Sequence, residues 1–127
     1  MKKILLIEDD TAIIDVYKMA LEAGGFNVEV ITTGKGVIER MDKLEKGEGE
    51  KPDLVLLDIV LPDMNGMDIL KEMRKKDSVK NLPVFVLTNY SDDKLEQLGS
   101  ELKSEKFILK AECAPSKLAK IVEERLK

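Results

Sequence analysis

The chain has 127 residues, a net charge of −4, no histidine and a single cysteine, Cys113. This length suits one domain with one core, and the acidic balance argues against a non-specific nucleic-acid binder. Without histidine, a Ser-His-Asp triad, a His-ligated zinc site and a histidine general base are excluded. The lone cysteine cannot form an intramolecular disulfide, and the N-terminal apolar run is too short for a signal peptide or membrane span. We therefore expect a cytoplasmic protein.

Strand and helix patterns alternate strictly along the chain. An apolar strand at 3–7 is followed by a helix at 11–24, and a more polar strand at 27–32 by a helix at 35–44. After a charged loop at 46–51, a strand at 54–57 precedes a helix at 67–76. The last pairs are a strand at 84–87 with a helix at 92–102, and a strand at 106–109 with a helix that begins near Pro115.

Five such pairs predict a doubly wound parallel α/β sheet with right-handed crossovers. The first, third and fourth strands are the most apolar and are expected at the centre, whereas the second is expected at an edge. This arrangement fits the flavodoxin-like (βα)5 fold with strand order 2-1-3-4-5. No linker or internal repeat appears, so residues 1–127 are expected to form a single domain with no output domain.

Polar groups follow four of the predicted strands. Glu8 and Asp9 follow the first, Asp58 the third, Thr88 the fourth and Lys110 the fifth. The carboxyl ends of parallel strands lie along one edge of a sheet, where open α/β sheets bind their ligands. We therefore expect these side chains to converge.

The converging groups predict phosphoryl chemistry. Three carboxylates would repel one another without a cation, and an all-oxygen donor set suits Mg²⁺. Asp58 can then act as a nucleophile toward phosphorus, as carboxylates do in aspartyl-phosphate enzymes. Thr88 offers a hydrogen bond and Lys110 a positive charge to the phosphoryl oxygens.

Four motifs resemble the receiver domain of bacterial two-component response regulators, over essentially the whole chain. They are Ile-Glu-Asp-Asp, Leu-Leu-Asp-Ile-Val-Leu-Pro-Asp-Met-Asn-Gly, Val-Leu-Thr and Phe-Ile-Leu-Lys. The resemblance implies that Asp58 accepts a phosphoryl group from a sensor histidine kinase or histidine phosphotransfer protein. It also implies that Glu8 and Asp9 hold Mg²⁺, with Asp9 as direct ligand and the Val60 carbonyl as a further ligand.

The resemblance further implies a conformational switch and a signalling role rather than an enzyme activity. Thr88 and Phe107 match the family's switch pair, and Lys110 matches its phosphate partner. Phosphorylation would then alter a face made of the fourth helix, fifth strand and fifth helix. The expected output is contact with a downstream protein target, with no direct nucleic-acid binding and no membrane.

Some positions depart from the family pattern. Ala111 replaces the proline that usually follows the lysine, which leaves open whether the Lys110–Ala111 peptide is cis or trans. Val60 and Tyr90 would flank the path of a water that attacks the aspartyl phosphate. We hypothesise that these bulky, non-acidic side chains slow self-hydrolysis.

Other polar residues have ordinary structural interpretations. Asp10 is well placed to cap the first helix. Asp63 and Asn65 are typical turn formers without a predicted role, and Cys113 is expected to be inert.

Two alternative functions remain beside the phosphoacceptor. One is a phosphorylation-independent interaction module on the same fold. The other is a Mg²⁺-dependent small-molecule phosphatase, which would need a second acid where Val60 stands and a cap domain for which the chain has no room. A flavodoxin is disfavoured because Glu8, Asp9 and Asp10 would repel the flavin phosphate.

Overall fold

The structure is a computed structural model that describes residues 1–90 and 92–127. The strands are β1 (Lys3–Ile7), β2 (Asn27–Ile31), β3 (Leu54–Asp58), β4 (Val84–Thr88) and β5 (Lys106–Leu109). The helices are α1 (Thr11–Ala23), α2 (Gly34–Glu45), α3 (Gly66–Lys75), α4 (Asp93–Glu101) and α5 (Pro115–Arg125). Every predicted element is present, with bounds that differ by no more than about two residues.

The five strands form one parallel sheet of order β2-β1-β3-β4-β5, as predicted. All five residues of β3 and of β4 are buried, whereas β2 and β5 at the edges are mostly half-buried. The register pairs Ile7 with Leu57, and Asp58 with Leu87. The carboxyl ends of the strands therefore lie along one edge of the sheet.

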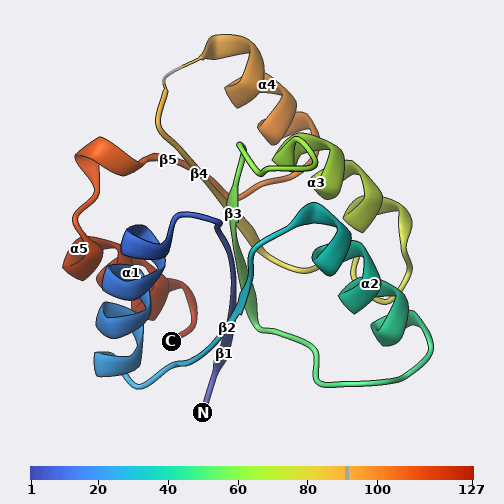
Figure 1. Cartoon of the computed structure of the whole chain (residues 1–127), viewed down its shortest axis with the longest axis horizontal. Helices are drawn as coiled ribbons and strands as arrows, with labels where there is room; N and C mark the ends of the chain where they lie inside the picture. Colours follow the sequence, from blue (N-terminus) through green and yellow to red (C-terminus); the bar gives the residue numbers. More distant parts are fainter. Residues whose placement is uncertain (91) are drawn as a thin grey trace.

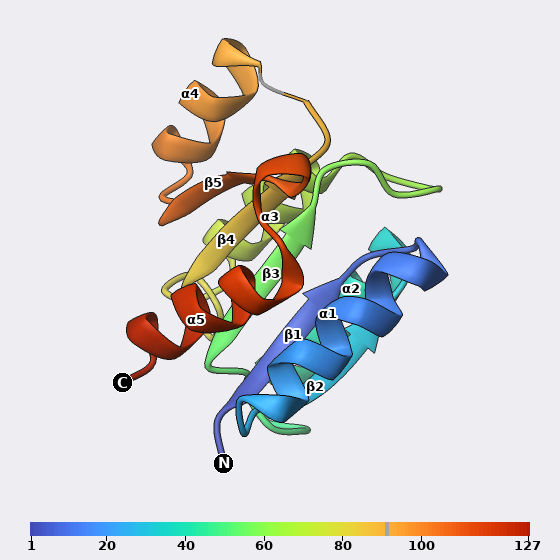
Figure 2. The same cartoon turned by 90° about the vertical axis from the view of Figure 1, so that its left-hand side faces the viewer.

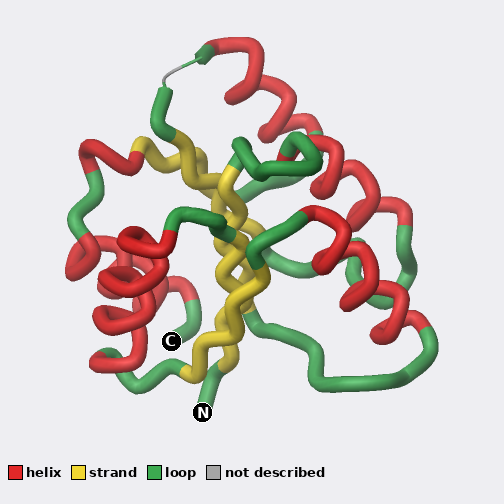
Figure 3. Tube along the Cα trace, in the orientation of Figure 1, coloured by secondary structure: helices red, strands yellow, loops and turns green. Residues whose placement is uncertain are grey.

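Helices cover both faces of the sheet, which Figures 1 and 3 show nearly edge-on between two groups of helices. One face packs against α1 and α5, with strand residues such as Leu6, Leu56 and Phe85 in the core. The other face packs against α2 and α3, with residues such as Ile7, Leu57 and Val86. Alternate residues of each central strand thus enter opposite cores, which explains why these strands are apolar throughout.

Helix α4 is the helix that is least embedded in the core (Figure 2). Gly99 is its one buried residue among those described, and Leu95, Leu98 and Leu102 pack against the core only in part. Arg74 of α3 donates to the carbonyl oxygen of Leu102 at 2.7 Å, at the end of α4. The C-terminal end of α4 is therefore attached to α3.

Three acidic or amide side chains cap helices around the sheet edge. Asp10 accepts from the Ile13 N–H at 3.2 Å and caps α1, as predicted. Asn65 accepts from the Met67 N–H at 2.7 Å and caps α3. Asp63 accepts from two N–H groups at the start of α2. Asp63 and Asn65 thus hold helix ends in place, a structural contribution beyond the turns that the sequence predicts.

The peptide after Lys110 is trans, since no peptide bond among the described residues is cis. The chain then makes a short 3₁₀ turn over Lys110–Glu112, which the sequence did not predict. Cys113 follows it and is buried, donating its N–H to the Lys110 carbonyl at 3.2 Å. Among the described residues, no helix has the length and apolar character to cross a lipid bilayer.

Candidate functional site

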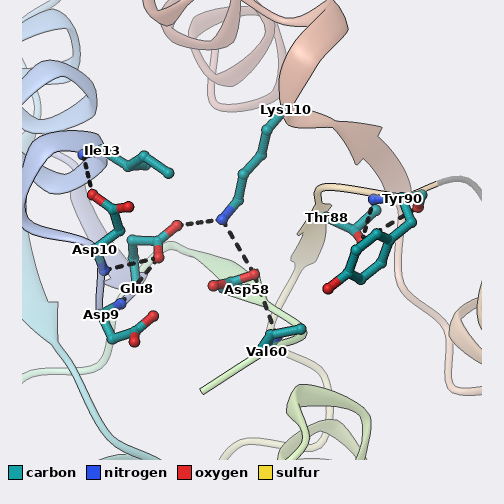
Figure 4. Close-up of polar contacts among 9 residues, drawn as sticks. All are labelled: Glu8, Asp9, Asp10, Ile13, Asp58, Val60, Thr88, Tyr90 and Lys110. Atoms are coloured by element: carbon teal, nitrogen blue, oxygen red, sulfur yellow. Dashed lines mark hydrogen bonds and ion pairs between the residues drawn. The ribbon is translucent and has the colours of Figure 1, made fainter. Parts of the chain in front are cut away.

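All of the predicted polar groups except Thr88 surround a cavity of about 230 Å³ at the carboxyl edge of the sheet. The loop after β1 and the last residue of β3 supply its acids, and the turn after β5 supplies its lysine (Figure 4). The residues that line it are Glu8, Asp9, Asp10, Ile13, Asp58, Val60, Asn89, Tyr90 and Lys110. The sheet topology therefore brings together the predicted metal ligands, the predicted nucleophile and the predicted phosphate partner.

Asp58 is the last residue of β3 and is only 4% exposed. Its Oδ1 lies 3.2 Å from Nζ of Lys110 and accepts the Val60 N–H at 3.4 Å. Both contacts use the same oxygen, so the other oxygen of the carboxylate has no hydrogen bond among the described residues. Asp58 thus keeps one oxygen for a reacting group.

Glu8 is the most deeply buried acid of the cavity, at 1% exposed. Its Oε2 accepts the N–H groups of Asp9 and Asp10 at 3.0 and 3.1 Å, and its Oε1 lies 2.5 Å from Nζ of Lys110. Both oxygens are therefore engaged within the protein. The carboxylate of Asp9 is exposed and has no such partner among the described residues, so it is the one of the pair that is free to bind a cation.

The electrostatics of the cavity are dominated by negative charge. Burial raises the pKa of Asp58 to about 6, and the nearby Glu8 carboxylate adds to the rise against the opposing effect of Lys110. Burial opposes the charged form of Lys110, but the hydrogen bond with Glu8 and the charge of Asp58 outweigh it and raise the pKa of Lys110. One lysine thus compensates two buried carboxylates incompletely.

This arrangement fits a divalent cation. Carboxylate oxygens of Glu8, Asp9 and Asp58 lie within 4.8 Å of one another. An all-oxygen set with two or three carboxylates is the environment that Mg²⁺ uses in proteins. Burial first, and the Glu8 carboxylate next, raise the pKa of Asp58, so its charged form is poorly stabilised and a bound cation would stabilise it.

The two predicted switch residues lie outside the cavity lining. Thr88 is buried, and its hydroxyl donates to the Tyr90 carbonyl at 3.3 Å and accepts the Tyr90 N–H at 3.2 Å (Figure 4). Phe107 is half-buried in β5, and a Cβ on Gly99 of α4 would lie 3.7 Å from its ring. Among the described residues, no side-chain hydrogen bond joins either of them to Asp58.

Sequence reasoning gave no binding role to Asn89 and Ile13, which also line the cavity. Asn89 directly follows β4, and this position is a signal that could have placed it at the edge. Ile13 lies in the first turn of α1. It is only half-buried because α1 begins beside the cavity.

Comparisons with known proteins agree with this fold. The family model for the response regulator receiver domain matches residues 4–123. The transcriptional regulatory protein CpxR homolog of Haemophilus influenzae is 37% identical over 102 residues, covering 80% of this chain and 40% of that protein. A CheY-like receiver domain protein from Methanospirillum hungatei superposes with a TM-score of 0.83 at 31% identity, covering 99% of this chain and 94% of that one.

A further structure, the phosphorylated cyanobacterial phytochrome response regulator RcpA, has a TM-score of 0.79 at 28% identity, with 98% of this chain and 90% of that chain covered. The chain therefore belongs to the response regulator receiver domain family of two-component signalling systems. It spans 40% to 52% of the length of the first curated relatives that it matches.

Proposed function

We propose that Asp58 is the phosphoacceptor of this receiver domain and that its phosphorylation controls binding to a protein target. The observation that carries the proposal is a buried carboxylate with one free oxygen, in a cavity that also holds an acidic pair and a lysine. A carboxylate kept partly uncompensated in such a place costs stability, which a purely structural role does not explain.

The proposed reaction transfers a phosphoryl group from a phosphohistidine of a sensor kinase or phosphotransfer protein. The free oxygen of Asp58 attacks phosphorus and forms an O–P bond, while the N–P bond of the donor breaks. The electron pair stays with the donor imidazole, which takes up a proton. This chain has no histidine, so the imidazole comes from the partner.

The residues of this chain act mainly by position and charge. Asp9, Asp58 and the Val60 carbonyl would hold Mg²⁺, which neutralises phosphoryl oxygens when bound. Glu8 would support the site from its buried position, because its oxygens already hold Lys110 and the start of α1. Lys110 would exchange part of its contact with Asp58 for a phosphoryl oxygen.

Thr88 would transmit the conformational effect of phosphorylation to the surface. Its hydroxyl pairs with the Tyr90 backbone by two contacts of 3.2 and 3.3 Å, which are long for O–H and N–H hydrogen bonds. A phosphoryl oxygen on Asp58 is a stronger, charged acceptor, so we propose that the hydroxyl turns toward it. Phe107 would then move inward, and the face formed by α4, β5 and α5 would change its affinity for a partner.

The proposed target is a protein, because the net charge of −4 provides no general basis for phosphate-backbone binding. Of the alternatives, a small-molecule phosphatase lacks its second acid, since Val60 occupies that position. A phosphorylation-independent module would not require the buried acids and lysine of the cavity.

The test is the response of the domain to Mg²⁺ and beryllofluoride, a mimic of the aspartyl phosphate, followed by amide chemical shifts. We expect shifts near Asp58 and also across α4, β5 and α5, with no response in Asp58→Ala. A Thr88→Ala variant should bind the mimic but lose the distant shifts. An unresponsive parent protein would refute the phosphoacceptor assignment.

A further inference from the structure

The loop between β3 and α3 is attached to the first turn of α2. Oδ1 of Asp63 accepts the N–H of Gly34 at 2.8 Å, and Oδ2 accepts the N–H of Lys35 at 2.9 Å. These residues are 28 and 29 positions apart from Asp63 in sequence. The backbone N–H groups hold the pKa of Asp63 below its usual range, so the carboxylate stays charged in this contact.

Met64 strengthens the same attachment by packing on Gly34. A Cβ at position 34 would lie 2.5 Å from the Met64 sulfur, 2.6 Å from its Cγ and 2.8 Å from its Cβ. The Cβ of Met64 cannot swing aside as the end of a flexible side chain can. A side chain at position 34 would therefore push the loop tip itself away from α2.

The attached loop is also the loop that carries Val60. At its base, the Gly66 N–H donates to the Ile59 carbonyl at 2.6 Å, and Val60 pairs with Asn65 in an antiparallel bridge. A Cβ on Gly66 would collide with the Asp58 carbonyl, so this base is closely packed. Leu61 anchors the loop in the core, and the contacts of Asp63 and Met64 with α2 hold its tip.

We propose that Asp63 is a positioning residue for the cation site, which it serves by fixing the β3–α3 loop so that the Val60 carbonyl is preorganised to bind Mg²⁺. The inference rests on the proposed function, because it takes Val60 as a ligand. Ordering a loop costs conformational entropy, and a ligand atom that is already ordered binds without that cost. Mutation of residues that orient metal ligands commonly lowers metal affinity by about 10- to 100-fold.

The structure supplies a matched control and an independent second perturbation. Thr33 caps α2 through its own hydroxyl, which accepts the Gly36 N–H at 3.0 Å, and its cap bond does not reach the β3–α3 loop. Thr33→Ala therefore weakens the same helix end without releasing the loop. Gly34→Ala has the opposite character, since alanine favours the helix while it displaces Met64.

The experiment measures Mg²⁺ binding to the unphosphorylated protein by calorimetry, with thermal unfolding in EDTA for each variant. Asp63→Ala and Gly34→Ala should each raise the Mg²⁺ dissociation constant roughly tenfold, whereas Thr33→Ala should lower the melting temperature and leave that constant unchanged. At saturating Mg²⁺, the rate of phosphorylation by acetyl phosphate should return close to that of the parent in all three.

Two outcomes would overturn the inference, and a third would refute the proposed function on which it rests. Parent-like Mg²⁺ affinity in Asp63→Ala would show that the attachment does not position Val60. An equal loss of Mg²⁺ affinity in Thr33→Ala would show that the affinity depends on the start of α2 and not on the attachment of the loop. A parent protein that binds no Mg²⁺ would instead refute the proposed cation site, which distinguishes the two failures.

Discussion

Nζ of Lys110 lies 2.5 Å from Oε1 of Glu8, although 102 residues separate them in the chain. The same nitrogen lies 3.2 Å from Asp58, so one lysine joins the first, third and fifth strands at the sheet edge. Its side chain is 7% exposed. Lys110 is therefore a structural counter-ion of two buried carboxylates as well as a candidate phosphate partner.

Replacing Lys110 should destabilise the Mg²⁺-free protein. Lys110→Met leaves two buried carboxylates without their cation, and breaking a buried pair in this way costs about 3–5 kcal/mol. Urea unfolding in EDTA should show this loss, and saturating Mg²⁺ should reduce it. Lys120→Met, at an exposed position on α5, is the control and should change stability little. If saturating Mg²⁺ did not reduce the loss of stability in Lys110→Met, the view that Lys110 and Mg²⁺ compensate the same carboxylates would be contradicted.

Asp58→Asn should stabilise the Mg²⁺-free protein at neutral pH. The pKa of Asp58 is raised from 3.8 to about 6 in the folded state. The protonated Asp58 therefore contributes its full stabilisation below pH 3.8, and this stabilisation is lost as the pH rises through about 6. Near pH 7, the free energy of unfolding of the variant should exceed that of the parent by about 1–3 kcal/mol. This estimate takes 1.36 kcal/mol for each pKa unit and subtracts the lost contact with Lys110. The difference should shrink toward pH 4.

The measurement is urea unfolding of both proteins in EDTA across this pH range. A less stable Asp58→Asn variant at neutral pH would mean that Lys110 compensates Asp58 fully. Added Mg²⁺ should favour the parent, because the cation neutralises the charge that the variant lacks.

Val60→Asn should shorten the lifetime of the aspartyl phosphate. Val60 and Tyr90 are 51% and 55% exposed, and both line the cavity above Asp58. The apolar side chain of Val60 offers no hydrogen bond to an attacking water, whereas an asparagine amide at this position can orient the water. The decay of phosphorylated protein in Mg²⁺ should be severalfold faster in the variant. Slower decay in Val60→Asn than in the parent would reject the hypothesis.

Much of this architecture is predictable because it depends on short-range patterns. The wholly apolar residues of β3 and β4 identify central strands, and the polar residue that ends each strand places the site. The parallel topology then brings Glu8, Asp58 and Lys110 together without any knowledge of side-chain geometry. Pattern and topology were sufficient to bring these charged residues to one cavity, but not to find Asn89 and Ile13 in its lining.

Contacts between distant loops were not predictable from the same patterns. Asp63 looks like a turn former because its partners, Gly34 and Lys35, lie in another connection of the chain. The hydroxyl of Thr88 faces the Tyr90 backbone, a choice of rotamer that no sequence pattern encodes. Arg74 appears as one more charge on a helix, yet it is half-buried and bonds backbone carbonyls.

Arg74 should therefore contribute more to stability than other arginines. Its guanidinium donates to the carbonyl oxygens of four residues at 2.7 to 3.1 Å: Lys80, Leu82, Leu102 and Lys103. Arg74→Lys keeps the charge but cannot reach all of them, so we expect a loss of about 2–3 kcal/mol. Urea unfolding measures the loss, and hydrogen exchange should be faster in α4.

Arg125→Lys provides the comparison, because Arg125 makes an exposed bidentate pair with Glu105 at 2.5 and 2.9 Å. That change should cost less than about 1 kcal/mol. Equal losses of stability in Arg74→Lys and Arg125→Lys would show that the hydrogen bonds from Arg74 to backbone carbonyls do not stabilise the protein.

The central claim is that Asp58 accepts a phosphoryl group with the help of Asp9 and a divalent cation. The most direct measurement is the intact mass of the protein after incubation with acetyl phosphate. We predict the addition of one phosphoryl group in Mg²⁺, little or none in EDTA or in Asp9→Ala, and none in Asp58→Ala. Addition to Asp58→Ala at the parent's level, or no addition to the parent in Mg²⁺, would contradict the account.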